Sequence, residues 1–239
     1  MRPWVISDVD GCVLPSPSEP PLPESLADLC RLVCGGAPFT LCSGRSAPYV
    51  LAVRDMLGAR APVLAEYGGV LARSVNLAET LPTLRGVAEW RAEVRARLGA
   101  AGVMDAAVEE IGKSVVVTLV PAEGGSLAEL RRRAAAALAE VPHTLADSQS
   151  AVDLLPPGLD KGVGVRWWAE ATGTVLAHAC AVGDSVADIA MLRAVGTPAC
   201  PANAAAEARV FVAGAGGVLA RGAATAGVVE VLRAVWRDG

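Results

Sequence analysis

The sequence has few of the residue types that bind nucleic acids or soft metals. Its 239 residues include only two histidines, and 21 Lys and Arg are outnumbered by 25 Asp and Glu, for a net charge of −4. A nucleic-acid surface would show a basic excess, so we expect no nucleic-acid partner. The one basic run, Arg131-Arg132-Arg133, fits a solvated helix face. The shortage of histidine argues against a zinc site.

Long apolar runs are also missing, although 53% of the residues are hydrophobic. No run is long enough to span a bilayer, so we expect no membrane partner. The N-terminal run Trp4-Val5-Ile6 ends at Asp8, too early for the core of a signal peptide. The six cysteines fit buried small hydrophobes in a reducing compartment. We therefore expect a cytoplasmic protein, either a monomer or a homodimer.

Short apolar segments alternate with amphipathic helices at both ends of the chain. The strands are unbroken apolar runs, which is typical of a parallel sheet covered by helices on both faces. The pattern predicts an open, Rossmann-like α/β core. The expected strands are 4–6, 38–42, 63–65 and 178–182, and the expected helices are 24–33, 47–57, 161–171 and 186–195.

The alternation breaks after residue 74 and resumes after Pro156-Pro157-Gly158. We therefore expect a core domain of residues 1–74 and 156–239, with a small α+β domain, residues 75–155, inserted into it. A unit tethered at both ends is placed to act as a cap that selects the substrate. A passive insertion or a dimer surface is the alternative. The expected helices of the inserted domain are 84–98 and 126–140, and its expected strands are 114–120 and 151–155.

The most informative motif is Asp8-Val9-Asp10-Gly11, directly behind the first apolar strand. Two ionised carboxylates so close together are costly to desolvate unless a cation or a reacting group lies between them. Taken alone, an Asp-x-Asp pair is better explained as a solvated strand end. Its importance therefore depends on what the other loops carry.

Three further motifs fall where the predicted parallel strands end. Ser43 and Gly44 offer a hydroxyl and backbone N–H groups to an anion, and Lys161 offers a point charge for a phosphate. Asp184 and Asp188 add two carboxylates. Singly, each fits a helix cap or a surface lysine. Because ligands bind at the carboxyl ends of parallel strands, the set together predicts a Mg²⁺ and phosphate site.

Taken in order, these motifs resemble the haloacid dehalogenase superfamily of phosphohydrolases. The insertion between Ser43 and Lys161 resembles the branch of Cof-like sugar phosphatases and of trehalose-, sucrose- and phosphoglycolate-type phosphatases. The segment Glu66-Tyr67-Gly68-Gly69 is similar to that branch's Glu-Asn-Gly segment. The resemblance covers the core, residues 1 to about 74 and 156 to 239.

The resemblance implies a role for each motif. Asp8 would be the nucleophile that forms an aspartyl phosphate, and Asp10 would be the general acid and base. Ser43, Gly44 and Lys161 would bind the phosphate. Mg²⁺ would be held by Asp8, Asp184 and the Asp10 backbone carbonyl, with Asp188 in support. The candidates for contacts with the rest of the substrate are Arg45, Glu66 and Asn203.

Three positions depart from the family pattern. Cys12 stands where threonine is usual and loses a hydroxyl that would orient the nucleophile. Tyr67 replaces a common asparagine, and Ala187 replaces the asparagine that Cof-like members carry before the last Asp. No group that would contact phosphate or metal is lost.

The resemblance thus implies a Mg²⁺-dependent phosphatase of a small phosphorylated sugar or organic acid. A phosphomutase or phosphotransferase of the phosphomannomutase type is an alternative, because the aspartyl phosphate can pass to a sugar hydroxyl instead of water. A catalytically idle binding protein would be expected to lack Asp8, Asp10 or Asp184, and all three are present. The sequence does not identify the substrate.

Overall fold

The computed structural model describes residues 2–15, 22–147 and 150–236. It contains two compact units, Met1–Glu79 with Asp160–Gly239, and Thr80–Leu159. The chain thus leaves the first unit after residue 79 and returns after residue 159, where the sequence pattern placed these points at 74 and 155. Most of the proline-rich stretch from Pro15 to Pro23 lies outside the described residues.

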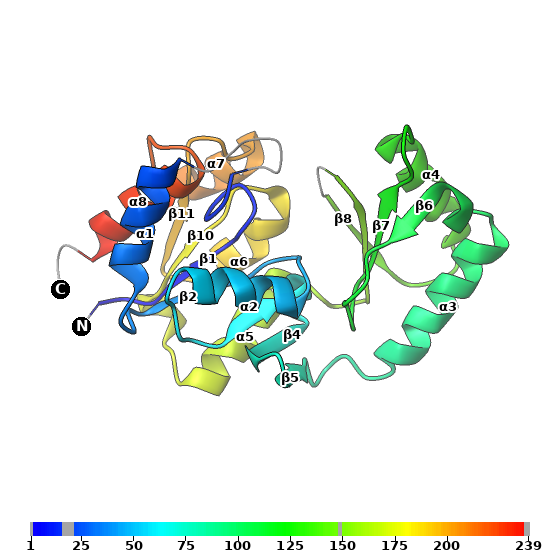
Figure 1. Ribbon diagram of the computed structural model, residues 1–239, viewed down its shortest axis with the longest axis horizontal. Helices are drawn as coiled ribbons and strands as arrows, with labels where there is room; N and C mark the ends of the chain where they lie inside the picture. Colours follow the sequence, from blue (N-terminus) through cyan, green and yellow to red (C-terminus); the bar gives the residue numbers. More distant parts are fainter. Residues whose placement is uncertain (1, 16–21, 148–149, 237–239) are drawn as a thin grey trace. The chain divides into compact units, whose positions relative to one another are not determined.

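The first unit is built on a five-stranded parallel sheet, which confirms the predicted α/β core (Figure 1). The strand order is β12-β11-β10-β1-β2. In the register, Ser7 lies beside both Val182 and Leu41, so the ends of β10, β1 and β2 are level. The strands are β1 (Val5–Ser7), β2 (Phe39–Leu41), β10 (Cys180–Val182), β11 (Thr197–Cys200) and β12 (Val218–Leu219).

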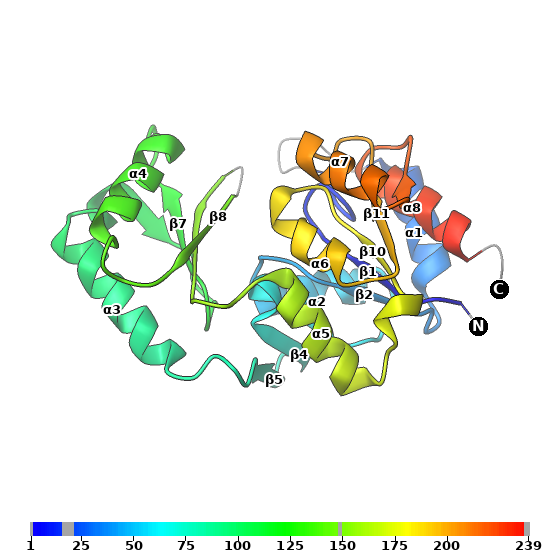
Figure 2. The ribbon, with the colours of Figure 1, turned by 180° about the vertical axis from the view of Figure 1, so that it is seen from behind.

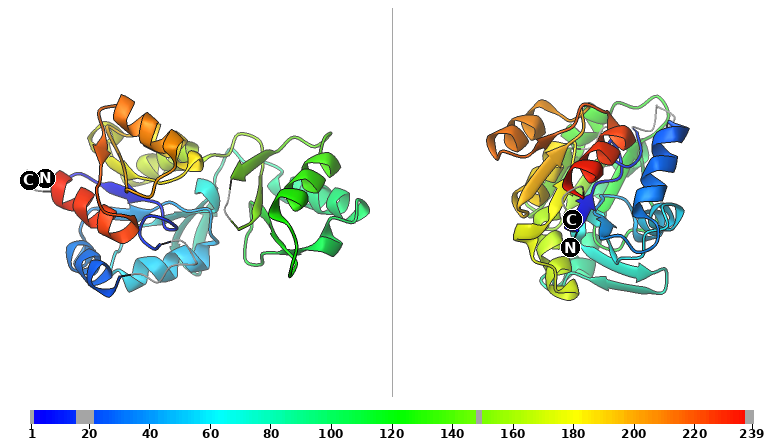
Figure 3. Two further views of the ribbon diagram at one scale, coloured as in Figure 1. Left: turned by 90° about the horizontal axis from the view of Figure 1, so that it is seen from above. Right: turned by 90° about the vertical axis from the view of Figure 1, so that its left-hand side faces the viewer.

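Helices cover both faces of this sheet (Figure 3). Helix α1 (Pro23–Val33) packs beside α8 (Ala224–Val235), and α5 (Lys161–Thr172), α6 (Ile189–Arg193) and α7 (Ala206–Gly214) lie on the other face (Figure 2). Buried residues of these three helices, among them Trp168, Leu192 and Val212, pack in one core with Ile6 of β1. In the part of the chain that the structure describes, no helix combines the length and apolar character needed to cross a membrane.

Two expected elements of this unit differ in the structure. Residues 186–195 form a 3₁₀ turn (Val186–Asp188) and the short helix α6 rather than one helix. Strand β3 (Val63–Ala65) lies parallel beside the end of β2, with Leu64 bridged to Cys42, and it also pairs antiparallel with β4 (Val70–Ser74), in a small sheet with β5 (Leu77–Thr80), which was not expected. The cause is the 3₁₀ turn Glu66–Gly68, whose three residues all have positive φ and reverse the chain. Other elements of this unit are α2 (Ala47–Met56) and the 3₁₀ turn Leu176–His178.

The second unit is an α+β domain with a four-stranded antiparallel sheet of order β6-β7-β9-β8. Alternate residues of its two central strands, such as Leu119 and Leu154, pack against Leu98 of α3 and Leu130 of α4. Strands β6 and β8 lie at the two edges of the sheet and were not expected, because each is short and flanked by polar residues. Its elements are α3 (Val87–Ala100), a 3₁₀ turn (Met104–Ala106), β6 (Ala107–Glu109), β7 (Val117–Pro121), α4 (Leu127–Ala137), β8 (Thr144–Asp147) and β9 (Val152–Leu155).

A close backbone contact holds α5 against the Glu66–Gly68 turn. A Cβ atom added to Gly164 of α5 would lie 2.3 Å from the Cα of Gly68, and one added to Gly68 would lie 2.6 Å from the Cα of Gly164. Both partners are backbone, so neither can move aside as a flexible side chain would. The contact therefore requires glycine on both sides, and it fixes the helix that begins at Lys161.

We predict that Gly164→Ala destabilises the protein by about 1–3 kcal/mol, because overpacking forces the backbone to shift. Alanine normally stabilises a helix relative to glycine, so the expected sign is reversed here. Gly214→Ala in α7 is the matched control, because a Cβ there meets nothing within 4 Å. Urea unfolding of both variants measures the difference. Equal stabilities for Gly164→Ala and the control would show that the two backbones do not touch.

Candidate active site

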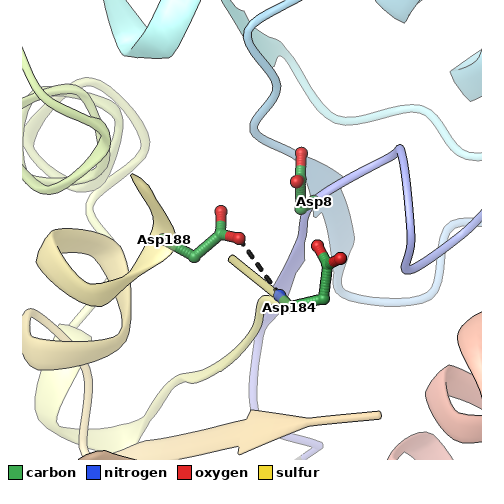
Figure 4. Close-up of side chains that lie close together, drawn as sticks. All are labelled: Asp8, Asp184 and Asp188. Carbon is green, nitrogen blue, oxygen red and sulfur yellow. Dashed lines mark hydrogen bonds between the residues drawn. The ribbon is translucent and has the colours of Figure 1, made fainter. Parts of the chain in front are cut away.

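The carboxylates of Asp8, Asp184 and Asp188 meet at the carboxyl edge of the parallel sheet (Figure 4). Asp8 follows β1 directly and Asp184 follows β10 by two residues, and these strands are neighbours in register. One oxygen from each carboxylate lies within 4.8 Å of the others. Asp8 is 6% exposed, Asp184 8% and Asp188 0%. The sequence-predicted convergence of these three residues is thus present in the structure.

Lys161 places its ammonium among these carboxylates. Its Nζ lies 2.9 Å from Asp8 Oδ1 and 2.6 Å from Asp188 Oδ1. The residue is the first of α5, whose N-terminus is capped by the Asp160 side chain, which accepts a hydrogen bond from the backbone N–H of Val163. One ammonium against three buried carboxylates leaves the cluster with excess negative charge.

This excess negative charge, together with burial, raises the pKa values of the carboxyl groups. Burial raises the pKa of Asp8 well above its ordinary range, and the charges of Asp188 and Asp184 add to this, while Lys161 opposes it. Burial, with the charge of Asp188, raises the pKa of Asp184 to about 7. Burial by itself would lower the pKa of Lys161, but the carboxylates of Asp188 and Asp8 outweigh it and raise that pKa. The cluster therefore favours a bound cation.

The donor atoms fit a hard divalent cation such as Mg²⁺, which prefers carboxylate oxygens. The two oxygens of Asp188 are already occupied, because Oδ1 accepts from Lys161 and Oδ2 accepts from the N–H groups of Asp184 and Ser185 and the Ser185 hydroxyl. Asp188 is thus equipped to orient the loop rather than to bind the ion directly. Asp8 is contacted by Val9 and Lys161 through Oδ1, and Asp184 by Cys12 through Oδ1, so each has fewer partners than Asp188 and is better suited to hold the metal.

The Asp10 side chain lies apart from this cluster and pairs with Arg45. The guanidinium donates to both carboxylate oxygens, at 2.9 and 3.0 Å, and lies 5.3 Å from the ring centroid of Tyr49. The sequence predicted Asp10 as acid and base and Arg45 as a substrate contact, but not this pair. The signal was available, because Asp10 and Arg45 follow neighbouring strands by three and four residues.

The predicted phosphate loop, Ser43 and Gly44, lies beside Tyr67. Ser43 is 1% exposed, and its Oγ accepts from the backbone N–H of Arg45 at 3.2 Å. The N–H of Tyr67 donates to the Ser43 carbonyl, and a Cβ on Gly44 would lie 2.7 Å from the Tyr67 ring. The same ring centroid lies 5.9 Å from Lys161 Nζ. Tyr67 therefore contacts all three predicted phosphate-binding residues, Ser43, Gly44 and Lys161. The sequence did not indicate this role for Tyr67.

Three other predicted positions make contacts that were not expected. The amide of Asn203 binds backbone groups, with Nδ2 donating to the Gly11 carbonyl at 2.9 Å and Oδ1 accepting from the Ala224 N–H at 2.7 Å. Glu66 is 1% exposed and lies in the turn before β4, where its N–H donates to the Arg45 carbonyl. Cys12 Sγ lies 3.8 Å from Asp184 Oδ1. The residue at this position therefore contacts Asp184, whereas we had expected an effect on the nucleophile.

Comparison with known proteins finds a family that is similar to part of the chain. Residues 105–213 match the family model of haloacid dehalogenase-like hydrolases. This stretch, which is less than half of the chain, is similar in sequence to haloacid dehalogenase-like hydrolases. The matched stretch includes Lys161, Asp184 and Asp188, while Asp8 and Ser43 precede it. No curated protein matches the chain.

Solved structures share the fold along almost the whole length of both chains. A haloacid dehalogenase-like hydrolase from Bacteroides thetaiotaomicron has a TM-score of 0.73 and 15% identity, with 98% of this chain and 100% of that chain covered. A protein from Thermoplasma acidophilum has a TM-score of 0.73 and 16% identity, with 98% of each chain covered. The sucrose-phosphatase of Synechocystis sp., solved with sucrose and phosphate, has a TM-score of 0.67 and 17% identity, with 98% of each covered. At these identities the likeness establishes the fold.

We predict that the metal-free protein loses stability as the pH rises from 3.8 to about 7. The raised pKa of Asp184 means that the folded state binds this proton more tightly than the unfolded chain, so the stabilisation is complete at low pH and is lost through pH 7. Urea unfolding in excess chelator measures it. Asp184→Asn should show a shallower decline and be more stable than wild type above pH 7. A wild-type stability that rises across this interval would contradict the electrostatic account.

Proposed function

We propose that the protein is a Mg²⁺-dependent phosphatase that hydrolyses a phosphomonoester of a small sugar or organic acid through an aspartyl phosphate on Asp8. The observation that carries this proposal is the anchoring of Asp8. Its Oδ1 accepts hydrogen bonds from the Val9 N–H at 2.7 Å and lies 2.9 Å from Lys161 Nζ. Within residues 2–15, 22–147 and 150–236, its Oδ2 accepts no hydrogen bond, so this oxygen is available to attack phosphorus.

In the first step, Asp8 Oδ2 forms a bond to phosphorus, the bond from phosphorus to the leaving oxygen breaks, and protonated Asp10 gives its proton to that oxygen. In the second step, water attacks the phosphorus of the aspartyl phosphate and passes a proton to Asp10, which releases inorganic phosphate and restores Asp8. Asp10 must exchange Arg45 for the leaving group to do this, because the guanidinium occupies both of its oxygens.

The charges of the cluster are suited to a phosphoryl group. Lys161 and the backbone and hydroxyl groups of Ser43 and Gly44 are placed to hold its oxygens. A bound Mg²⁺, held by Asp8 and Asp184, would neutralise charge on the carboxylates and on the phosphoryl oxygens. Asp188 keeps Lys161 and the Asp184 loop in place.

Fold likeness and the insertion support the proposed substrate class. The Synechocystis structure holds sucrose and phosphate, which supports a small phosphorylated sugar or a comparable metabolite as the substrate here. We assign the choice among such substrates to the inserted unit, Thr80–Leu159, because the chain leaves it immediately before Lys161.

We predict phosphate release from a panel of phosphorylated sugars and organic acids that requires Mg²⁺ and stops in excess chelator. Asp8→Asn should lower the rate by several orders of magnitude, because an amide keeps the size but lacks the nucleophilic charge. Asp28→Asn is the matched control, because Asp28 lies on α1 and pairs with Arg31 and Arg233. Phosphate release by Asp8→Asn at the wild-type rate would refute the mechanism, and sugar-phosphate isomers without phosphate release would indicate a mutase.

For Asp10→Asn we predict a burst with p-nitrophenyl phosphate. This leaving group departs without a proton donor, so the aspartyl phosphate still forms, but water is no longer activated and turnover stays slow. Stopped-flow absorbance should show about one p-nitrophenolate per enzyme, followed by a slow phase. A sugar phosphate, which needs protonation of its leaving oxygen, should give no burst. Steady turnover of both esters by this variant at the wild-type rate would show that Asp10 is not the general acid and base.

A further inference from the structure

The loop that follows β11 touches both loops that carry the reactive carboxylates. The Ala205 N–H donates to the Asp184 carbonyl at 2.7 Å. Two residues earlier, Asn203 Nδ2 donates to the carbonyl of Gly11 at 2.9 Å, and Gly11 belongs to the turn that begins at Asp8. One short segment therefore ties the Asp8 turn to the Asp184 loop.

The position of Gly11 matters for Asp184. Gly11 has φ +78°, and a Cβ on it would lie 2.1 Å from Asp184 Oδ2. The Gly11 backbone thus packs directly on the carboxylate that we assign to the metal. A shift of this peptide would change the distance between the Asp8 and Asp184 carboxylates.

A second hydrogen bond holds the same turn from the start of α8. The hydroxyl of Thr225, which is 3% exposed, donates to the Val13 carbonyl at 2.7 Å. The preceding residue, Ala224, donates its N–H to Asn203 Oδ1 at 2.7 Å and has φ +43°. Such a φ is unfavourable for alanine, so the surrounding contacts hold this residue in place. Asn203, Ala224 and Thr225 therefore form one connected unit against the Asp8 turn.

We propose that Asn203 and Thr225 are positioning residues that clamp the Gly11–Val13 segment and so set the geometry of the Asp8 and Asp184 carboxylates for the metal and the phosphoryl group. The inference rests on the proposed function. Neither residue takes part in the chemistry, and each acts through a backbone carbonyl.

Three variants separate the two hydrogen bonds of the clamp. Asn203→Asp keeps the oxygen that accepts from Ala224 and removes the donor to Gly11. Thr225→Val keeps the shape and removes the hydroxyl, whereas Thr225→Ser keeps the hydroxyl. The control for Asn203→Asp is Asn76→Asp, because Asn76 is exposed in the turn between β4 and β5. All are made in the full chain.

We expect Asn203→Asp and Thr225→Val each to weaken Mg²⁺ binding and lower kcat by about 10–100-fold, as is typical for residues that orient metal ligands. Calorimetric titration of the metal-free protein with Mg²⁺ measures the first effect. A new carboxylate near the site would by itself strengthen cation binding, so weaker binding by Asn203→Asp reports geometry and not charge. In the metal-free protein, amide exchange at Cys12 and Val13 should become faster. Thr225→Ser should restore wild-type values, and Asn76→Asp should match wild type.

The outcomes separate this inference from the proposed function. If wild type neither binds Mg²⁺ nor releases phosphate, the proposed function fails. If wild type does both and the two variants bind Mg²⁺ and turn over as wild type does, the clamp does not position the site. Tighter Mg²⁺ binding by Asn203→Asp, or failure of Thr225→Ser to restore affinity, would also overturn the inference.

Discussion

The contact on which the site depends is the buried ammonium of Lys161 between Asp8 and Asp188. Both carboxylates are desolvated, and removing one partner of a buried charge pair costs about 3–5 kcal/mol because a charge is left uncompensated. Lys161 therefore fixes where Asp8 can lie, and through Asp188 it fixes the Asp184 loop as well. The ammonium leaves part of the negative charge uncompensated, and this excess is the basis of our proposal that the cluster binds a cation.

The parallel sheet explains how residues so distant in sequence reach one another. Strands β10, β1 and β2 are adjacent and level, so the loops after them bring Asp184, Asp8 and Ser43 to one edge. Helix α5 delivers Lys161 to the same edge, and the Gly68–Gly164 contact holds that helix against the turn that also supports Ser43. The fold supplies position, while the side chains supply charge.

The parallel sheet and most of the site residues could be predicted from the sequence, because both depend on short local patterns. Unbroken apolar strands predicted a parallel sheet, and acids, hydroxyl and lysine at strand ends predicted the residues that meet there. The antiparallel partner of β3 could not be predicted, because that pairing depends on the left-handed turn at Glu66–Gly68 and not on the apolar residues of β3.

The partners of the predicted residues were harder to foresee. The Arg45 pair with Asp10 and the Tyr67 ring on Gly44 arise from tertiary contacts between loops. The Asn203 contact with Gly11 spans most of the chain and depends on two loops meeting at the same sheet edge. A polar residue after a strand indicates a site, but its hydrogen-bond partner is set by packing.

The central claim is that Asp8 becomes covalently phosphorylated during turnover. The most direct measurement is acid quenching of the wild-type protein during turnover of a phosphomonoester with Mg²⁺, followed by peptide mapping with mass spectrometry. The account predicts a phosphoryl group on Asp8 that disappears under mild base, as an acyl phosphate does, and that is absent when Mg²⁺ is withheld. Turnover that leaves no phosphoryl group on Asp8, or one that is found on another residue, would contradict it.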